Sequence, residues 1–168
     1  MERVHEVYDA SYRRLVGQLT GVTGDPVEAE DAVMEAFARA VNNSRSFLDA
    51  DNPEAWLRTV AVNVTRTRWR RSRFFRDVSH RLVAQESYAD LPDDRITLLA
   101  ALRRLPPAQR EAIALHHLAD LPVAEVARAV GSPEGTVKAR LARGRTALAA
   151  LLADADLQAD PESERSPR

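Results

Sequence analysis

A helix signal, a turn signal and a second helix signal follow one another between residues 121 and 145, and this order most constrains the fold of the chain. In the segment LPVAEVARAV (121–130), apolar residues recur at helical spacing. Gly131 follows at the position where a helix commonly ends in a left-handed residue, and Pro133 suits the first turn of the next helix. The sequence therefore predicts a helix-turn-helix whose second helix lies in GSPEGTVKARLARGR (131–145).

The second of these helices has one apolar side and one basic side. Its predicted buried stripe is Val137, Leu141, Gly144, Leu148 and Leu151. The opposite side and its flanks carry small residues and cations, namely Ala139, Ala142, Arg143, Lys138, Arg140 and Arg145. No acidic residue occurs between Thr136 and Ala153. Small residues let a helix approach the major groove of DNA while cations reach phosphates or guanine edges, although a solvated basic face on a bundle helix gives the same pattern.

The composition indicates a helical protein with a real core and no cysteine chemistry. The apolar residues AVILMFWYC make up 45% of the 168 residues, and no stretch shows the alternation of a β-strand. The net charge is only −1, so a nucleic-acid surface has to arise from uneven charge distribution. The absence of cysteine excludes disulfides, thiolate zinc sites and cysteine nucleophiles. The sequence shows no signal peptide and no apolar run of about 18 residues, which predicts a cytoplasmic protein without membrane insertion.

Helical periodicity continues through the first part of the chain. We expect helices over residues 4–19, 26–41 and from 53 onward, with a polar loop at 42–51. Asp25 is a good N-cap for the second of these helices, and Pro26 suits its first turn.

The predicted fold is all-α, with two small helical domains joined by a linker, the second a helix-turn-helix. We expect the domains at residues 1–76 and 95–152 and a polar linker at 77–94. The segment 153–168 is poor in apolar residues, which predicts a disordered tail.

A basic segment closes the first unit. Between Trp56 and Arg76 the chain has seven arginines and no acidic residue, and Trp69, Phe74 and Phe75 lie among the arginines. Cations that follow a phosphate backbone, interleaved with aromatic rings that stack on bases, suit single-stranded or melting DNA. Trp56 fits a core anchor better, while core and DNA roles both stay open for Trp69 and the two phenylalanines.

The helix expected at 26–41 carries the opposite charge. Its acidic residues, with the capping residue, are Asp25, Glu28, Glu30, Asp31 and Glu35, and they precede its only cation, Arg39. Acids in the first turns of a helix interact favourably with its dipole, which explains part of the pattern. A DNA-binding protein also gains by keeping acids off its DNA face, so this helix is a candidate surface for a protein partner.

The C-terminal unit resembles a known family. The segment ALRRLPPAQREAIALHHLADLPVAEVARAVGSPEGTVKARLARGRTAL is similar to domain 4 of bacterial sigma factors of the extracytoplasmic-function (ECF) group, most specifically at Leu105–Arg110 and Gly135–Arg143. In that family the second helix of the domain reads the −35 promoter element. The resemblance implies major-groove contacts by Thr136, Lys138, Ala139, Arg140, Ala142, Arg143 and Arg145. Ala139 stands where the family often has serine, so one hydroxyl contact is absent.

The first unit resembles domain 2 of the same family. NPEAWLRTVAVNVTRTRWRRSRF is similar to the helix that reads and melts the −10 element. This likeness implies contacts to single-stranded DNA by Asn63, Arg66, Thr67, Trp69 and Arg70. The loop 42–51 would form the pocket for a flipped-out −10 base, with Phe47 and Asp49 as candidate readers.

The acidic helix is similar to the segment by which these sigma factors dock on the clamp-helix coiled coil of core RNA polymerase. The likeness implies that Asp31, Met34, Glu35 and Phe37 contact the polymerase, with Met34 in place of the usual glutamine. The resemblance as a whole implies an ECF sigma factor of the sigma-70 family, which binds core RNA polymerase and promoter DNA and directs initiation without catalytic residue, metal, cofactor or small-molecule substrate. An anti-sigma factor is a further partner that the sequence leaves open.

Three other classes of protein fit less well. An enzyme lacks support because the adjacent residues His116 and His117 would point about 100° apart on a helix and cannot easily share a metal ion. In addition, no Gly-rich phosphate loop follows a strand. A dimeric DNA-binding regulator would need a sensor or dimerisation domain, and the acidic helix followed by an arginine-aromatic helix does not suit one. An anti-sigma factor or adaptor is disfavoured because the DNA-facing positions are intact.

Overall fold

The computed structural model describes residues 2–72 and 93–159, and every regular element in these two ranges is helical. The N-terminal half consists of α1 (Glu2–Thr23), α2 (Pro26–Asn42), α3 (Ser44–Leu48) and α4 (Pro53–Ser72). The C-terminal half consists of α6 (Asp93–Arg104), α7 (Pro107–Ile113), the π-helical turn η1 (Ala114–Leu118), α8 (Val123–Val130) and α9 (Glu134–Ala159). The all-α prediction is confirmed. Phe74, Phe75, Arg76 and nearly all of the expected linker lie outside the described residues.

The turn between α1 and α2 follows the capping signals in the sequence. Oδ1 of Asp25 accepts a hydrogen bond from the backbone N–H of Val27 at 2.9 Å, and Pro26 opens α2, so the predicted cap is confirmed. Gly24 has φ = 73°, a left-handed conformation that glycine adopts without strain. α1 ends at Thr23, beyond the predicted residue 19, because Gly21 continues the helix instead of breaking it.

The loop expected at residues 42–51 contains one helical turn, α3. Phe47 is fully buried there and packs edge-on against Trp56 of α4, with ring centroids 5.5 Å apart. The indole N–H of Trp56 donates a hydrogen bond to Oγ of Ser46 at 3.2 Å, which fixes α3 against α4. The assignment of Phe47 as a candidate base reader is therefore wrong, whereas the core role of Trp56 is confirmed. Asp49 remains exposed after α3.

The basic helix α4 places its arginines on different sides. Arg58 points inward: it is 8% exposed, and its Nε donates a hydrogen bond to Oε1 of Gln18 in α1 at 2.9 Å. A second donor, Nη2, bonds Oε1 of Glu54 at 3.2 Å. A buried guanidinium needs such partners, because an unpaired buried charge is strongly destabilising. Arg58 thus belongs to the core. Its position in the basic run had indicated a nucleic-acid face instead.

The helix-turn-helix consists of α8 and α9. Gly131 ends α8 with φ = 64°, as its position predicts, and the N–H of Ser132 bonds back to the carbonyl of Ala127 at 3.1 Å. Val137 and Leu141 of α9 are fully buried, and a Cβ on Gly144 would lie 2.9 Å from Cγ1 of Ile113. Glycine at 144 therefore lets α9 cross α7 closely, which confirms the predicted stripe.

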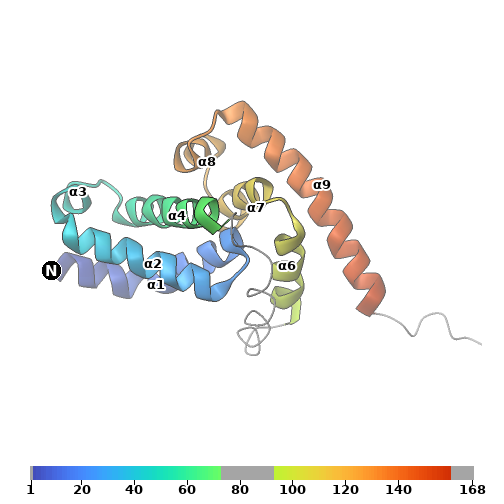
Figure 1. The fold of residues 1–168 in the computed structure, drawn as a ribbon, viewed down its shortest axis with the longest axis horizontal. Coiled ribbons are helices and arrows are strands. Elements are labelled where there is room, and N and C mark those ends of the chain that lie inside the picture. The colour runs from blue at the N-terminus through green and yellow to red at the C-terminus, as the bar shows by residue number, and fades with distance from the viewer. Residues whose placement is uncertain (1, 73–92, 160–168) are drawn as a thin grey trace, which may run out of the picture.

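The last helix is longer than the sequence indicates. α9 continues to Ala159, so the first residues of the segment expected to be a disordered tail are helical. Leu151 and Leu152 are half-buried, whereas Leu157 is 78% exposed. Residues 160–168 lie outside the described residues. Figure 1 shows that this end of α9 runs away from the N-terminal half.

The two halves pack against each other and share one continuous cluster of buried apolar residues. Figure 1 shows α8 above the end of α4 and α7 beside α1. Nε of Arg110 in α7 donates a hydrogen bond to the carbonyl of Val22 in α1 at 2.8 Å. A Cβ added to Gly21 of α1 would lie 3.2 Å from Cβ of Ala114 and would overlap Cδ1 of Leu118, so the absent side chain allows η1 to approach α1.

Candidate nucleic-acid interface

The outer side of α9 is a continuous exposed surface. Six of the seven predicted residues are exposed, namely Thr136, Lys138, Ala139, Ala142, Arg143 and Arg145. Arg140 is half-buried, and its Nη1 donates a hydrogen bond to Oγ of Ser132 at 3.2 Å, so its guanidinium lies beside the turn that precedes the helix. The structure brings these cations together on one side of a helix whose other side is buried. Their contact with DNA stays a prediction.

A second candidate surface lies on α4. One face of the helix carries Asn63 and, three, four and seven residues later, Arg66, Thr67 and Arg70. Three of them are exposed, whereas Arg66 is half-buried. Trp69 is half-buried at the side of this face, so its ring has one covered and one accessible part. The row is suited to follow one strand, with two small polar side chains among the cations.

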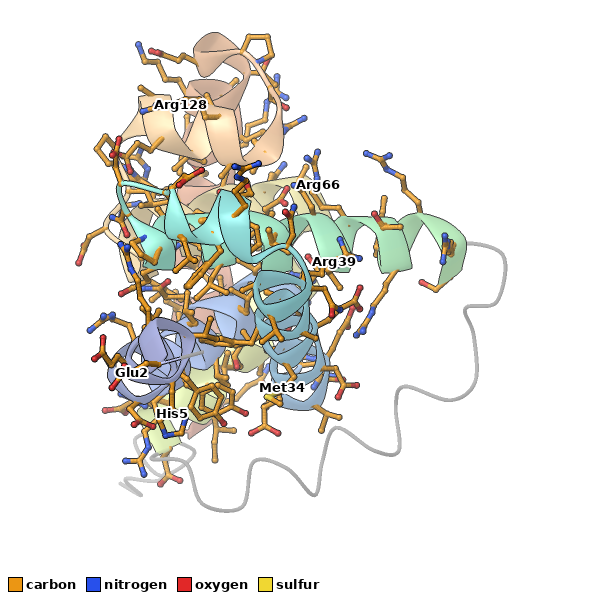
Figure 2. The ribbon with its side chains drawn as sticks, turned by 90° about the vertical axis from the view of Figure 1, so that its left-hand side faces the viewer. Glu2, His5, Met34, Arg39, Arg66 and Arg128 are labelled. Carbon is orange, nitrogen blue, oxygen red and sulfur yellow. The ribbon has the colours of Figure 1, made fainter. Side chains whose placement is uncertain are left out.

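Arg66 is half-buried because it contacts the C-terminal half. Its Nη1 donates a hydrogen bond to the carbonyl of Val130, the last residue of α8, and its Nε lies 3.5 Å from Oε1 of Glu111 in α7. Figure 2 shows Arg66 on the side of α4 that faces α8, away from Met34. We call these two interactions the Arg66 contact. The sequence gives no sign of it, because the partners lie 64 and 45 residues away and in the other half.

Glu111 is an unusual carboxylate because it is 7% exposed. Its Oε1 makes no hydrogen bond within the part of the chain that the structure describes, so the ion pair with Arg66 is its direct interaction there. Burial raises the pKa of Glu111, and the charges of Arg66, Arg140 and Arg110 act against that shift. Glu111 thus lies in the positive field of Arg66, from the candidate DNA surface on α4, and of Arg140, from the one on α9. Glu111 was not among the residues predicted from the sequence.

The candidate protein-binding surface on α2 is only partly as expected. Asp31 is exposed and Met34 is 48% exposed, an unusual position for a large apolar side chain. Phe37, in contrast, is 5% exposed and packs against Tyr8 with ring centroids 5.1 Å apart. Its predicted contact with a polymerase is therefore corrected: Phe37 is part of the core beneath this surface.

Glu35 connects α2 with the basic helix. Its carboxylate accepts hydrogen bonds from Arg39 of α2 and from Nη2 of Arg68 in α4, the latter at 2.8 Å. Burial alone would raise the pKa of Glu35, but the hydrogen bonds and charges of the two arginines outweigh burial and lower it. The residue is therefore ionised and paired, and a partner that bound Glu35 would compete with Arg68.

The described residues contain no cluster of three or more His, Cys, Asp or Glu that could hold a metal ion. Nδ1 of His116 lies 2.7 Å from the carbonyl of Leu121, and its ring stands edge-on to that of His117 at 4.8 Å. Burial, together with His116 and Arg145, lowers the pKa of His117. In the two described ranges, no helix has both the length and the apolar character that crossing a membrane requires.

Each half of the chain matches a known protein family. Residues 7–75 match the family Sigma-70 region 2, and residues 95–148 match Sigma-70, region 4. The RNA polymerase sigma-E factor of Streptomyces antibioticus is 34% identical over 142 residues, which cover 83% of this chain and 78% of the relative. The ECF RNA polymerase sigma factor SigW of Bacillus subtilis is 31% identical, with 89% of this chain and 84% of the relative covered. Among solved structures, the chain is similar to the sigma factor RpoE from Bartonella quintana, which was solved in complex with the anti-sigma factor NepR. The two superpose with a TM-score of 0.71 at 26% identity, and the match covers 91% of this chain and 98% of that chain.

Proposed function

Since the chain belongs to the sigma-70 family of RNA polymerase sigma factors, in which its curated relatives include ECF sigma factors, we propose how its two halves divide the work of promoter-specific initiation. The N-terminal half, residues 1–76, binds core RNA polymerase and reads the −10 element, and the C-terminal half, residues 95–152, reads the −35 element. Residues 77–94 connect them. The observation that carries this proposal is the basic outer side of α9 placed directly after the turn at Gly131.

The −35 element is read by α9. The helix has no acid between Thr136 and Ala153, and its exposed cations flank two small residues, Ala139 and Ala142. This combination suits a helix that enters the major groove, because the alanines allow close approach to the base edges. Lys138 and Arg143 reach the phosphates or guanine edges on either side, and Arg140 and Arg145 extend the basic surface.

The −10 element is held as a single strand by the face of α4 that carries Asn63, Arg66, Thr67 and Arg70. Trp69 offers part of its ring for base stacking. A stacked base contributes about 1–3 kcal/mol, which is comparable with the cost of taking a base out of the duplex. Melting then needs no catalytic group, so the protein acts without enzymatic chemistry, metal or cofactor of its own.

Core RNA polymerase binds the outer side of α2. Asp31 and Met34 offer a carboxylate and an exposed apolar side chain next to each other, and Glu35 lies at the edge of this surface. Separation of this acidic surface from the basic surfaces keeps the polymerase and DNA from competing for one site. The site of action is the cytoplasm, where polymerase and promoter DNA are found. An anti-sigma factor is a further partner, since the structural relative from Bartonella quintana was solved with one.

The proposal is tested by transcription from a genomic promoter library with bacterial core RNA polymerase, with and without this protein. We expect new start sites that share two spaced upstream motifs. The variant Arg143→Ala should weaken use of the −35 motif, whereas Arg13→Ala, an exposed arginine on α1, should not. If the core binds the protein and no new start appears, an inhibitory role replaces the one proposed. If core is not bound, the assignment of α2 fails.

A further inference from the structure

Lys138 is the only lysine among the 24 lysine and arginine residues of the chain. It lies in the second turn of α9, on the basic side of that helix, and its side chain is exposed. The other cations on this side are arginines. An arginine guanidinium stays protonated, whereas a lysine amine can lose its proton and then react as a nucleophile. Lys138 therefore carries the one side-chain amine in the sequence that an acyl donor can modify.

The surroundings of Lys138 leave its amine accessible. Its exposed neighbours one turn away on α9 are Glu134, Gly135 and Ala142. Gly135 has no side chain and Ala142 has only a methyl group, so neither covers the amine. Glu134 stands four residues earlier, at the spacing of a helical ion pair, yet the side chain of Lys138 makes no ion pair or hydrogen bond within the two described ranges. A reagent in solution can therefore reach the amine without displacing a partner from those ranges.

The position of Lys138 on α9 makes the charge of this one residue important. Lys138 shares one flank of the basic side with Arg145, which is exposed and lies seven residues, or two turns, later. Arg140 lies on the other flank, where its Nη1 donates a hydrogen bond to Oγ of Ser132 at 3.2 Å. Neutralising Lys138 therefore leaves Arg145 as the only lysine or arginine on its flank of the proposed −35 surface and does not alter the other flank.

We propose that Lys138 is an acylation site, at which an acyl phosphate weakens reading of the −35 element. The neutral amine attacks the acyl carbon, so that a C–N bond forms while the C–O bond to phosphate breaks. Phosphate leaves with the bonding electron pair, and the proton released by the amine goes to water. The product is a neutral amide, so α9 loses one exposed positive charge. The inference rests on the proposed function, because it takes Lys138 as a residue that contacts the −35 element.

The expected effect on DNA binding is that of one lost phosphate contact. The slope of log affinity against log salt concentration should fall by about 0.9. Loss of a hydrogen bond from a charged group should lower the affinity by about tenfold. Binding is weakened and not abolished, because Arg140, Arg143 and Arg145 keep their charges. Since the chain has a single lysine, one modification per molecule produces the whole effect.

The first experiment treats the free full chain with acetyl phosphate and measures acetylation at Lys138 by mass spectrometry after tryptic digestion. Trypsin does not cleave after an acetylated lysine, so modification joins the peptide that ends at Lys138 to the next two residues. The matched control combines Lys138→Arg with Arg13→Lys, which moves the single lysine to an exposed position on α1. We expect similar rates of acetylation at the two positions. Modification of the control without modification of Lys138 would overturn the proposal.

The second experiment removes the acetyl phosphate, adds core RNA polymerase and measures affinity for a promoter from the library at several salt concentrations. Acetylation should lower the affinity of the unsubstituted protein by about tenfold and the salt slope by about 0.9, and it should leave the control unchanged. Bound promoter DNA should also protect Lys138 from acetyl phosphate, but not the lysine introduced at position 13. Equal affinity before and after acetylation, or an equal loss in the control, would overturn the proposal.

Failure of the proposed function gives a different result from failure of the acylation site. If the unmodified protein directs polymerase to no promoter, the proposed function fails. The rates in the free chain are measured without polymerase or DNA, so they still decide whether Lys138 is an acylation site.

Discussion

The charged side chain of Arg58 holds two helices together inside the N-terminal half. It is almost fully buried and bonded to Gln18 of α1 and Glu54 of its own helix, so it connects two helices by directional interactions. Arg14 of α1 also bonds Glu54. The carboxylate therefore pairs with one buried and one exposed guanidinium, and its loss removes the acidic group that bonds Arg58 directly.

The pKa of Glu54 yields a prediction for stability. The hydrogen bond from Arg14 lowers this pKa, burial opposes the shift, and the charges of Arg14 and Arg58 lower it further. A lowered folded-state pKa means that the carboxylate stabilises the fold above its unfolded pKa of about 4.3 and loses this effect as the pH falls through the folded value. Glu54→Gln should therefore cost about 1–3 kcal/mol of unfolding free energy at pH 7 and progressively less in the acid range.

Urea unfolding at pH 7 and at two pH values below 4.5 measures this difference. Glu6→Gln is the control, because Glu6 is an exposed glutamate on α1. A difference between Glu54→Gln and the unsubstituted protein that stayed constant with pH would show that the carboxylate charge is not the cause.

Single residues also mark where sequence reasoning was insufficient. The helical period identified the buried stripe of α9 and the capping signal of α2, because both depend on neighbours within a few residues. It did not place Phe47, Phe37 or Arg58 inside, since burial of these side chains depends on which helix covers them. The family resemblance assigned Phe47 and Phe37 to functional surfaces, and the basic run around Arg58 did the same for that residue.

At the scale of elements, the turn between α8 and α9 depends on one backbone conformation. Gly131 has a positive φ, whereas Gly135, in the first turn of α9, is helical and a Cβ there would meet nothing within 4 Å. Both glycines are exposed, and a Cβ on Gly131 would make only an ordinary contact, 3.9 Å from Nη1 of Arg66. The two positions therefore differ mainly in the backbone conformation that they require. The orientation of α9 relative to α8 follows from the first of them.

Alanine at these two glycines should have opposite effects. Gly131→Ala forces a side chain into the left-handed region and should cost about 1–2 kcal/mol. Gly135→Ala should be neutral or stabilise the protein by up to about 1 kcal/mol, because alanine is the better helix former. Thermal unfolding of both variants measures the contrast. Destabilisation of equal size would mean that the turn does not impose the positive φ.

The basic side of α9 yields a prediction for binding. If Arg143 contacts a phosphate, Arg143→Ala should reduce the slope of log affinity against log salt concentration by about 0.9 for promoter binding by the holoenzyme. Arg13→Ala, on α1, should leave the slope unchanged. Titrations at several salt concentrations check this, and an unaltered slope and affinity for Arg143→Ala would exclude this side of α9 as the phosphate-binding surface.

At the scale of the whole molecule, the arrangement of the halves was beyond prediction from the sequence. Periodicity and capping located most helices, and the resemblance of two segments to sigma domains 2 and 4 gave their order. The packing depends on contacts between distant residues, such as Gly21 with Leu118 and Arg66 with Glu111. The sequence around Gly21 or Arg66 does not indicate which distant residue each of them contacts.

The packing of the halves can be opened by steric means. Gly21→Leu should separate η1 from α1, because even a Cβ at this position overlaps Leu118. Gly17→Leu, one turn earlier in the same helix, is the control because a Cβ there meets nothing within 4 Å. Small-angle X-ray scattering should show a larger radius of gyration for Gly21→Leu alone. The same radius for both variants would mean that the halves do not depend on this approach.

Because acidic α2 is separated from basic α9, the molecule has an electric dipole and takes a preferred orientation in an electric field. Its net charge of −1 provides almost no attraction toward a polyanion at long range. Charges become effective within the screening length of about 8 Å at physiological ionic strength, and there DNA repels one end and attracts the other. If α9 binds DNA and α2 binds the polymerase as proposed above, the result is a torque more than a pull. Encounters with DNA then turn the protein so that α9 arrives first and α2 points outward, where a large partner can still reach it.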